Sequence, residues 1–165
     1  MTDASMADTA AATEPPARKL GAVKVAGILG ILGGIVLIVM GIVIWIAVSV
    51  QLQAENITIP DDAMAFQGQT VAGPFTAYVQ ADIIQHHAME ASGGMTYAQL
   101  AQDDPVRQTM MTASFLRASL FTSVVSFGVA AFAMGVGVLS IIFGWAVHRL
   151  ASAPVVIKRS QFAGS

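Results

Sequence analysis

Residues 25–50 read VAGILGILGGIVLIVMGIVIWIAVSV, twenty-six residues without one charged side chain. A second uncharged run, thirty residues long, occupies positions 118–147. A helix needs about 20 apolar residues to cross ~30 Å of hydrocarbon, and both runs exceed that length. Because lipid offers no partners for backbone N–H and C=O groups, both runs are expected to be helical. The sequence therefore predicts an all-α membrane protein whose two transmembrane helices form an antiparallel hairpin.

The predicted organisation has five parts. They are a disordered cytoplasmic tail (1–20), a first transmembrane helix (21–52), an extracytoplasmic and mostly helical segment (53–104), a long helix that continues into the second transmembrane helix (105–149), and a second cytoplasmic tail (150–165). The first apolar run is about twice as long as the ~7–15-residue core of a cleaved signal peptide, so it is read as a retained anchor. Outside the two runs only 109 residues remain, too few for a large soluble catalytic domain.

Composition narrows the class of protein further. An apolar fraction of 55% with 11% charged residues is typical of a membrane protein. The net charge of −2 and the lack of a dense basic cluster give no electrostatic footprint for nucleic acid. The chain has no cysteine, which excludes disulfides, thiolate metal sites and thiol catalysis.

Charge asymmetry predicts the orientation of the hairpin. Six of the eight basic residues flank its two open ends: Arg18, Lys19, Lys24, Arg149, Lys158 and Arg159. The segment between the runs has two basic residues against seven acids. By the positive-inside rule the protein is a multi-pass plasma-membrane protein with both termini cytoplasmic and residues 53–117 mostly extracytoplasmic. Trp45 and Trp145 then fit the outer and inner interfacial belts.

The segment between the runs carries helix signals. Pro74 suits the first turn of a helix, and a roughly 3.6-residue apolar period follows it until Gly93 and Gly94. Thr96 with Gln99 predicts a capped short helix that reaches about Gln102. After it, the pair Asp104-Pro105 reads as the N-cap and first residue of the long helix.

The long helix should extend beyond the hydrocarbon. Counting about 20 residues back from Trp145 reaches Ser126, so the preceding turns stand outside it. Their apolar residues need cover, which the small external helices are expected to supply; these residues are Leu116, Leu120, Phe121 and Val124.

Small residues in both spans predict helix-packing faces. The first span carries one stripe, Gly27, Gly30, Gly34 and Gly41, and the second span carries two opposite faces, Gly128-Ala131-Gly135 and Gly137-Ser140-Gly144. One face of the second span can pack within the hairpin, which leaves the other for self-association or another membrane protein. The general abundance of glycine in membrane helices explains the same residues. The expected partners are therefore the lipid bilayer and either a second copy of this chain or another membrane protein.

Asp82, His86, His87 and Glu90 make one titratable cluster on the predicted external helix. Asp82, His86 and Glu90 are spaced i, i+4, i+8, so their side chains could meet on a divalent metal such as zinc or ferrous iron. A further ligand would be needed, for which the pair Asp103-Asp104 is the expected source. A solvated face in which the acids pair with the histidines explains the same pattern. No cofactor is predicted beyond this candidate divalent metal.

The block from PFTAYVQADIIQHHAMEASGGMTYAQL through DDPVRQTMMTASFLRASLFTSVVSFGVAAFAMGVGVL resembles a family of small actinobacterial two-span membrane proteins. Its most particular pieces are Gly93-Gly94, Thr96-Tyr97 and the stretch ASFLRASLFTS at 113–123. Members often carry the automatic label "aromatic ring-opening dioxygenase LigA". The resemblance covers residues 20–150 and implies an actinobacterial plasma membrane, with no established activity. The expected function is an accessory or scaffolding membrane subunit; the alternative is a metal-binding protein or metal-dependent enzyme using the His and carboxylate cluster.

Overall fold

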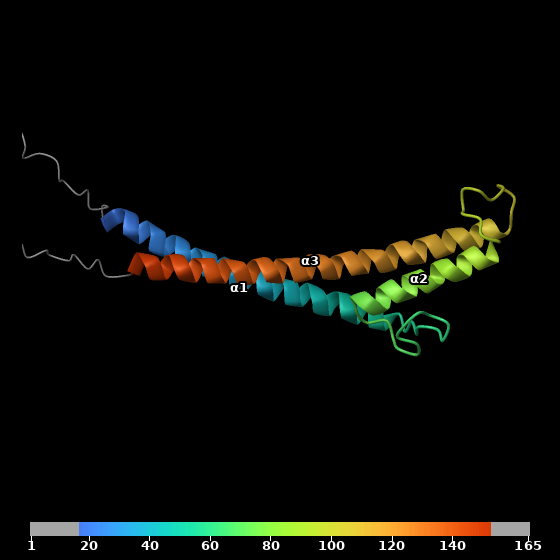
Figure 1. Cartoon of the computed structure of the whole chain (residues 1–165), viewed down its shortest axis with the longest axis horizontal. Coiled ribbons are helices and arrows are strands. Elements are labelled where there is room, and N and C mark those ends of the chain that lie inside the picture. The colour runs from blue at the N-terminus through green and yellow to red at the C-terminus, as the bar shows by residue number, and fades with distance from the viewer. Residues whose placement is uncertain (1–16, 153–165) are drawn as a thin grey trace, which may run out of the picture. The chain divides into compact units, whose positions relative to one another are not determined.

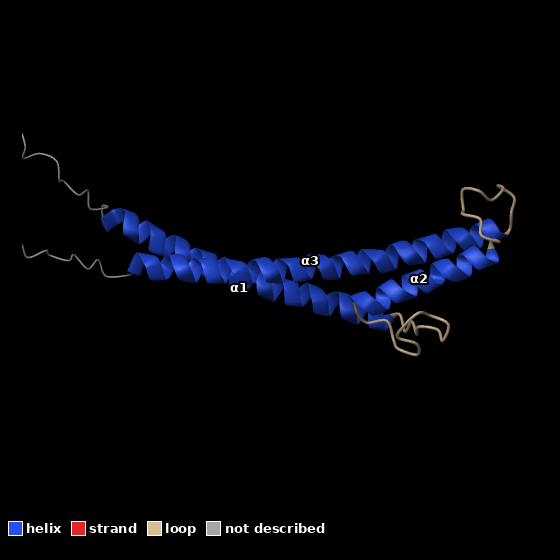
Figure 2. Cartoon of the chain, viewed as in Figure 1, coloured by secondary structure: helices blue, strands red, loops and turns tan. Residues whose placement is uncertain are grey.

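Three helices make up the described part of the protein. The computed structural model describes residues 17–152, in the order α1 (Ala17–Ala54), α2 (Pro74–Ala91) and α3 (Val106–Ser152) (Figure 1). Within residues 17–152 loops join these helices and there is no strand (Figure 2). Most of each predicted cytoplasmic tail, residues 1–16 and 153–165, lies outside the described residues. The all-helical class predicted from the sequence is confirmed.

The two longest helices carry the apolar runs. α1 has 38 residues and α3 has 47, and the segments Gly21–Ala54 and Val106–Ser152 are both long and apolar enough to cross a membrane. At ~1.5 Å per residue, α3 is about 70 Å long, more than twice the thickness of a hydrocarbon core. Part of α3 must therefore lie outside any bilayer that it crosses.

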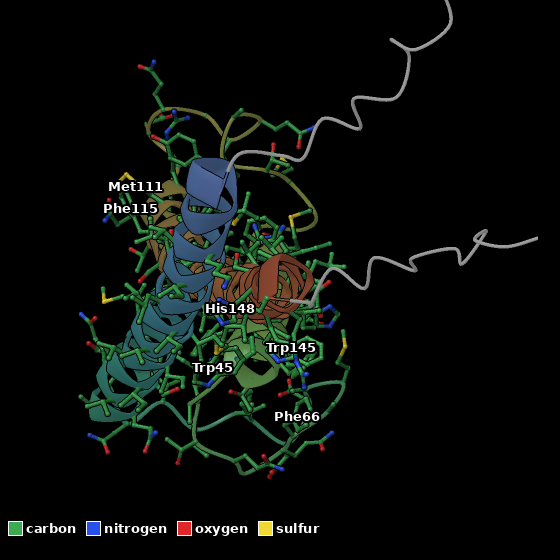
Figure 3. All side chains as sticks on the ribbon, turned by 90° about the vertical axis from the view of Figure 1, so that its left-hand side faces the viewer. Trp45, Phe66, Met111, Phe115, Trp145 and His148 are labelled. Carbon is green, nitrogen blue, oxygen red and sulfur yellow. The ribbon has the colours of Figure 1, made fainter. Side chains whose placement is uncertain are left out.

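The chain divides into two compact units. One unit comprises the chain up to Gly34 together with the chain from Leu139 onward, and the other comprises Ile35–Val138. In the first unit α1 and α3 pack through Gly27 and Gly144 with almost no space between their backbones. His148 lies beside Gly27 in this packing, between the two helices (Figure 3).

The second unit contains the main hydrophobic core. Residues from the end of α1, the following loop, α2 and the middle of α3 form it, and Phe127, Ile59 and Val71 are its largest fully buried side chains. Trp45 packs edge-on against Phe127 with ring centroids 4.8 Å apart. Trp45 is thus a half-buried residue that packs against the core of this unit. Its role is therefore wider than that of an interfacial tryptophan exposed to lipid headgroups.

The predicted signals at the two ends of α2 are confirmed. The helix begins at Pro74, where Thr76 Oγ1 accepts the N–H of Gly73 at 3.0 Å. It ends at Ala91, and the chain then turns at Gly93 and Gly94, whose φ values of +64° and +83° favour glycine.

The loop from α1 to α2 is ordered by a few backbone contacts. Thr58 and Thr70 form an isolated antiparallel bridge, and the N–H of Val71 donates to the Ile57 carbonyl at 2.9 Å. This pairing turns Ile59 and Val71 into the core, at 1% and 0% exposure. The loop therefore packs as part of the second unit.

The prediction of a short helix at 96–102 is wrong. The Thr96 N–H does donate to Gln99 Oε1 at 2.8 Å, but the chain makes only a turn there. Gly94 on one side and Pro105 on the other leave too few residues to repay the cost of nucleating a helix. Asp104 Oδ1 accepts the N–H of Val106 at 2.8 Å, as a cap should, and α3 begins at Val106 rather than at Pro105.

The predicted cover over the N-terminal half of α3 is confirmed in part. α2 lies along this half of α3 (Figure 1), and Leu120 is 4% exposed with Val124 packed beside it in the core. Leu116 and Phe121 remain 48% and 36% exposed. Since α2 is one helix wide, it shields one side of α3 and leaves the other sides open.

Candidate functional site

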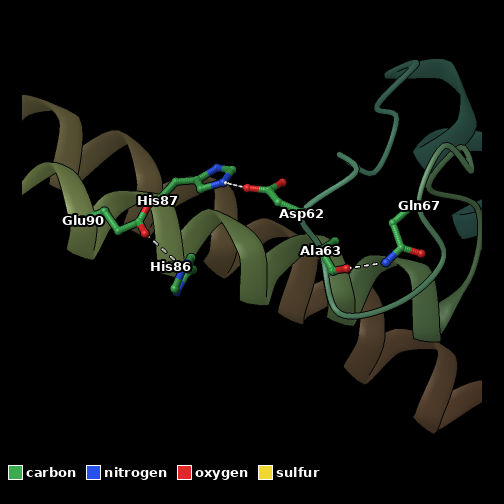
Figure 4. Close-up of polar contacts among 6 residues, drawn as sticks. All are labelled: Asp62, Ala63, Gln67, His86, His87 and Glu90. Carbon is green, nitrogen blue, oxygen red and sulfur yellow. Dashed lines mark hydrogen bonds and ion pairs between the residues drawn. The ribbon is translucent and has the colours of Figure 1, made fainter.

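The predicted His and carboxylate cluster is divided into two pairs. His87 Nε2 of α2 lies 2.6 Å from Asp62 Oδ2 of the preceding loop (Figure 4). His86 Nε2 lies 3.2 Å from Glu90 Oε1, one helical turn further along α2. Asp82 is exposed on the same helix. The four predicted residues are therefore close in sequence, but the contacts do not gather them around one point.

Asp62 is the residue that sequence reasoning missed. It lies 25 positions before His87, and no helical spacing connects the two. The loop brings them together because Ala63, the next residue, is buried at 4% exposure and holds this part of the chain against the core. Gln67 Nε2 also donates to the Ala63 carbonyl at 2.5 Å (Figure 4). Asp62 is thus the carboxylate from outside α2 that contacts a histidine of the cluster, whereas Asp104 accepts the N–H of Val106 at the start of α3.

The hydrogen bond with His87 lowers the pKa of Asp62 below its ordinary value of 3.8. The bond stabilises the charged carboxylate, which is the form that accepts it. Both side chains are about half exposed, at 47% for His87 and 59% for Asp62, so water screens the pair. The pair thus links the loop to α2 through a hydrogen bond at the protein surface.

The described residues contain no group of three or more His, Asp or Glu side chains arranged to hold a metal ion. Each histidine of the cluster already contacts one carboxylate. A stable site for zinc commonly needs three or four protein ligands. A metal would therefore require the Asp62 and Glu90 pairs to rearrange.

The glycine stripe of α1 faces α3. A Cβ at Gly27 would lie 2.8 Å from the Gly144 carbonyl oxygen, and one at Gly41 would lie 2.8 Å from that of Ala130. A Cβ at Gly30 would meet Gly144 Cα at 3.4 Å, and Gly34 is also buried. At Gly27 and Gly41 the two helices approach too closely for a larger residue, whereas a Cβ at Gly30 would make an ordinary van der Waals contact.

The two small-residue faces of α3 differ in their surroundings. On the face of Gly137, Ser140 and Gly144, both glycines are buried, and a Cβ at Gly144 would lie 2.9 Å from the backbone nitrogen of Ile31 in α1. On the other face, Gly128, Ala131 and Gly135 are exposed. A Cβ at Gly128 or Gly135 would meet nothing within 4 Å.

An open groove of about 520 Å³ lies between α2 and α3. Ile84, Ala88 and Leu116 form much of its apolar wall, with His87 at one side. Met111 and Phe115 also project from α3, and Phe115 is 69% exposed (Figure 3). The N-terminal half of α3 therefore carries exposed apolar surface of its own.

No protein-family model, curated protein or solved structure matches this chain. The resemblance to the small two-span family stays a prediction, and no functional residue is carried over from a relative.

Proposed function

We propose that this protein is an accessory or scaffolding subunit of the plasma membrane. It is a two-span hairpin with both termini in the cytoplasm, a helical cap (residues 53–104) outside, and residues 53–117 mostly extracytoplasmic. The order of contacts within each unit supports the antiparallel hairpin, because earlier residues of α1 meet later residues of α3. In one unit Gly30 lies near Ser140 and Gly27 lies near His148. In the other unit Trp45 packs against Phe127 and Gly41 lies near Met134. The charge bias between the termini and the cap supports the orientation.

The open face of Gly128, Ala131 and Gly135 is the observation that carries the proposal. Small residues favour helix association in lipid because they let backbones approach closely. Gly41 uses this property against Ala130, whereas Gly128 and Gly135 have no neighbour within 4 Å of a built Cβ. A transmembrane helix of a second copy or of another membrane protein fits such a face. Neither apolar run contains an ionisable residue, so nothing favours an ion or proton path.

A Gly135→Leu variant tests this proposal. The added side chain projects from the open face and should weaken association while the hairpin still folds. Gly33→Leu is the matched control, since Gly33 of α1 also has nothing within 4 Å of a built Cβ but lies outside the proposed face. Native mass measurement in mild detergent and identification of co-purifying proteins give the readout. A wild-type protein that is monomeric with no partner, and that Gly135→Leu does not change, would refute the proposal.

The contact between Asp62 and His87 favours one alternative, a metal-binding protein or a metal-dependent enzyme of the kind the dioxygenase label suggests. A carboxylate and an imidazole from separate elements already meet there at 2.6 Å. Elemental analysis of the purified protein tests this alternative. Stoichiometric zinc, iron or copper that is lost in a His87→Ala variant would support it.

A further inference from the structure

Position along α3 gives a measure of depth in the proposed membrane. If Trp145 marks the inner boundary, the hydrocarbon ends about 20 residues earlier, near Ser126. The headgroup layer adds roughly 5–7 Å on each side, which is about four residues of helix. This layer then extends along α3 from Ser126 to about Phe121 or Thr122.

The first turns of α2 lie at the same depth. The ring centroid of Tyr78 is 6.0 Å from that of Phe121, and the rings are inclined at 79°. Three residues further along α2, the Ala81 carbonyl accepts a hydrogen bond from Arg117 Nε at 3.3 Å. The two helices therefore run antiparallel here, since later residues of α2 lie beside earlier residues of α3. The start of α2 is level with residues 124–125 of α3.

Aromatic side chains are exposed at this level. Phe75 is 74% exposed and Tyr78 is 49% exposed, and their i, i+3 spacing puts them on neighbouring positions of one side of α2. Phe121 of α3, against which Tyr78 packs, is 36% exposed. Water is an unfavourable environment for such a group of rings, whereas the membrane interface is where tyrosine and other amphipathic rings gather.

The group continues an apolar stripe of α3. Val125, Val129 and Phe132 are 63%, 57% and 73% exposed, and with Phe121 they repeat every three or four residues along one side of the helix. At the other end, the Arg117 guanidinium lies 5.7 Å from the centre of the Phe121 ring. This side of α3 thus runs from exposed apolar residues through Phe121 to the charged Arg117, in the order that hydrocarbon, headgroups and water would require.

We propose that Phe75, Tyr78 and Phe121 form an aromatic anchor that lies in the headgroup layer of the outer leaflet. The partner of this surface is the phospholipid bilayer itself. The anchor holds the first turn of α2 against the membrane and so fixes the cap relative to the spans. This inference rests on the proposed two-span hairpin and adds a second type of membrane contact to it.

Single cysteines carrying a spin label test the anchor, because the chain has no cysteine of its own. The full chain is reconstituted in phosphatidylcholine–phosphatidylglycerol vesicles with a label at Phe75→Cys, Phe115→Cys or Phe132→Cys. Phe115 is the matched control, an aromatic residue 69% exposed and about 9 Å further out along α3 than Phe121. Collision rates with oxygen, which enters lipid, and with a nickel chelate, which stays in water, are compared.

The label at position 75 should collide several-fold more with oxygen, relative to nickel, than the label at 115. If positions 75 and 115 give the same water-like ratio while 132 lies in lipid, the anchor is refuted and the hairpin stands. If the label at 132 is also in water, the proposed membrane hairpin itself fails. Protection of position 75 from both reagents would refute the anchor in favour of a protein contact.

Discussion

Gly27 of α1 and Gly144 of α3 lie so close that neither has room for a side chain. A Cβ at Gly27 would lie 2.8 Å from the Gly144 carbonyl oxygen, and a Cβ at Gly144 would lie 2.6 Å from that of Gly27. Backbone atoms on both sides make this contact rigid, so a methyl group cannot be absorbed by a flexible side chain. The small-residue stripe is therefore a packing surface at this point.

A Gly144→Ala substitution should destabilise this packing by about 1–3 kcal/mol, the usual cost of overpacking a close contact. Gly135→Ala is the matched control on the same helix, because a Cβ there meets nothing within 4 Å. Unfolding in mixed micelles measures both variants. Equal stability of the two would show that the backbones separate easily at Gly144.

Phe127→Ala should cost about 3–5 kcal/mol, since it removes a large core side chain and leaves a cavity. Phe127 is 1% exposed and contacts Trp45, whereas Phe132 on the same helix is 73% exposed. The control, Phe132→Ala, should change stability by less than about 0.5 kcal/mol, as surface substitutions usually do. A similar loss in both variants would mean that the two phenylalanines are equally buried in the folded protein.

His87→Ala should raise the pKa of Asp62 toward its ordinary value of 3.8, because the variant removes the hydrogen bond that lowers it. Since the folded-state pKa is lowered, the pair stabilises the fold fully above pH 3.8 and loses this effect as the pH falls through the lowered pKa. Carbon-13 NMR of the Asp62 carboxyl measures the shift. Asp103→Asn, a change outside the pair, should leave the titration of Asp62 unchanged.

A cysteine at Ala98 should react with an impermeant thiol reagent added to intact cells, and one at Ser160 should not. The positive-inside rule predicts that the tail with Lys158 and Arg159 is cytoplasmic. Ala98 is exposed in the turn before α3, whereas Ser92 is 4% exposed with its hydroxyl bonded to two carbonyl groups, so a cysteine at Ser92 would be shielded on either side of the membrane. Labelling of the Ser160→Cys variant without labelling of the Ala98→Cys variant would show that the topology is the reverse of the predicted one.

Purified protein should keep its melting temperature in a strong chelator. Each of His86 and His87 has a single carboxylate neighbour, and fewer than three ligands converge among the described side chains. A drop of several degrees in the chelator, reversed by added zinc or iron, would show that the pairs rearrange around a metal. That result would favour the metal-dependent alternative over the accessory subunit.

Local sequence signals predicted much of the segment between the long helices. Pro74 begins α2 and Gly93 follows its end, because these residues have conformational preferences that act over one or two neighbours. The capping signal at Thr96 and Gln99 misled the prediction because it too acts only locally: the capping hydrogen bond forms, but no helix follows it. A cap contributes one or two hydrogen bonds, which is not enough to make a helix in so short a stretch.

The sequence by itself determined the helical class and the two apolar helices, since an uncharged run of this length has one way to satisfy its backbone in lipid. Only the tertiary structure decided which small-residue face of α3 meets α1, because Gly128 and Gly144 are alike as sequence and differ only in their neighbours. It also decided that Asp62 meets His87. That contact depends on how the loop folds over α2, and loop folding follows from burial across the whole unit rather than from any local pattern.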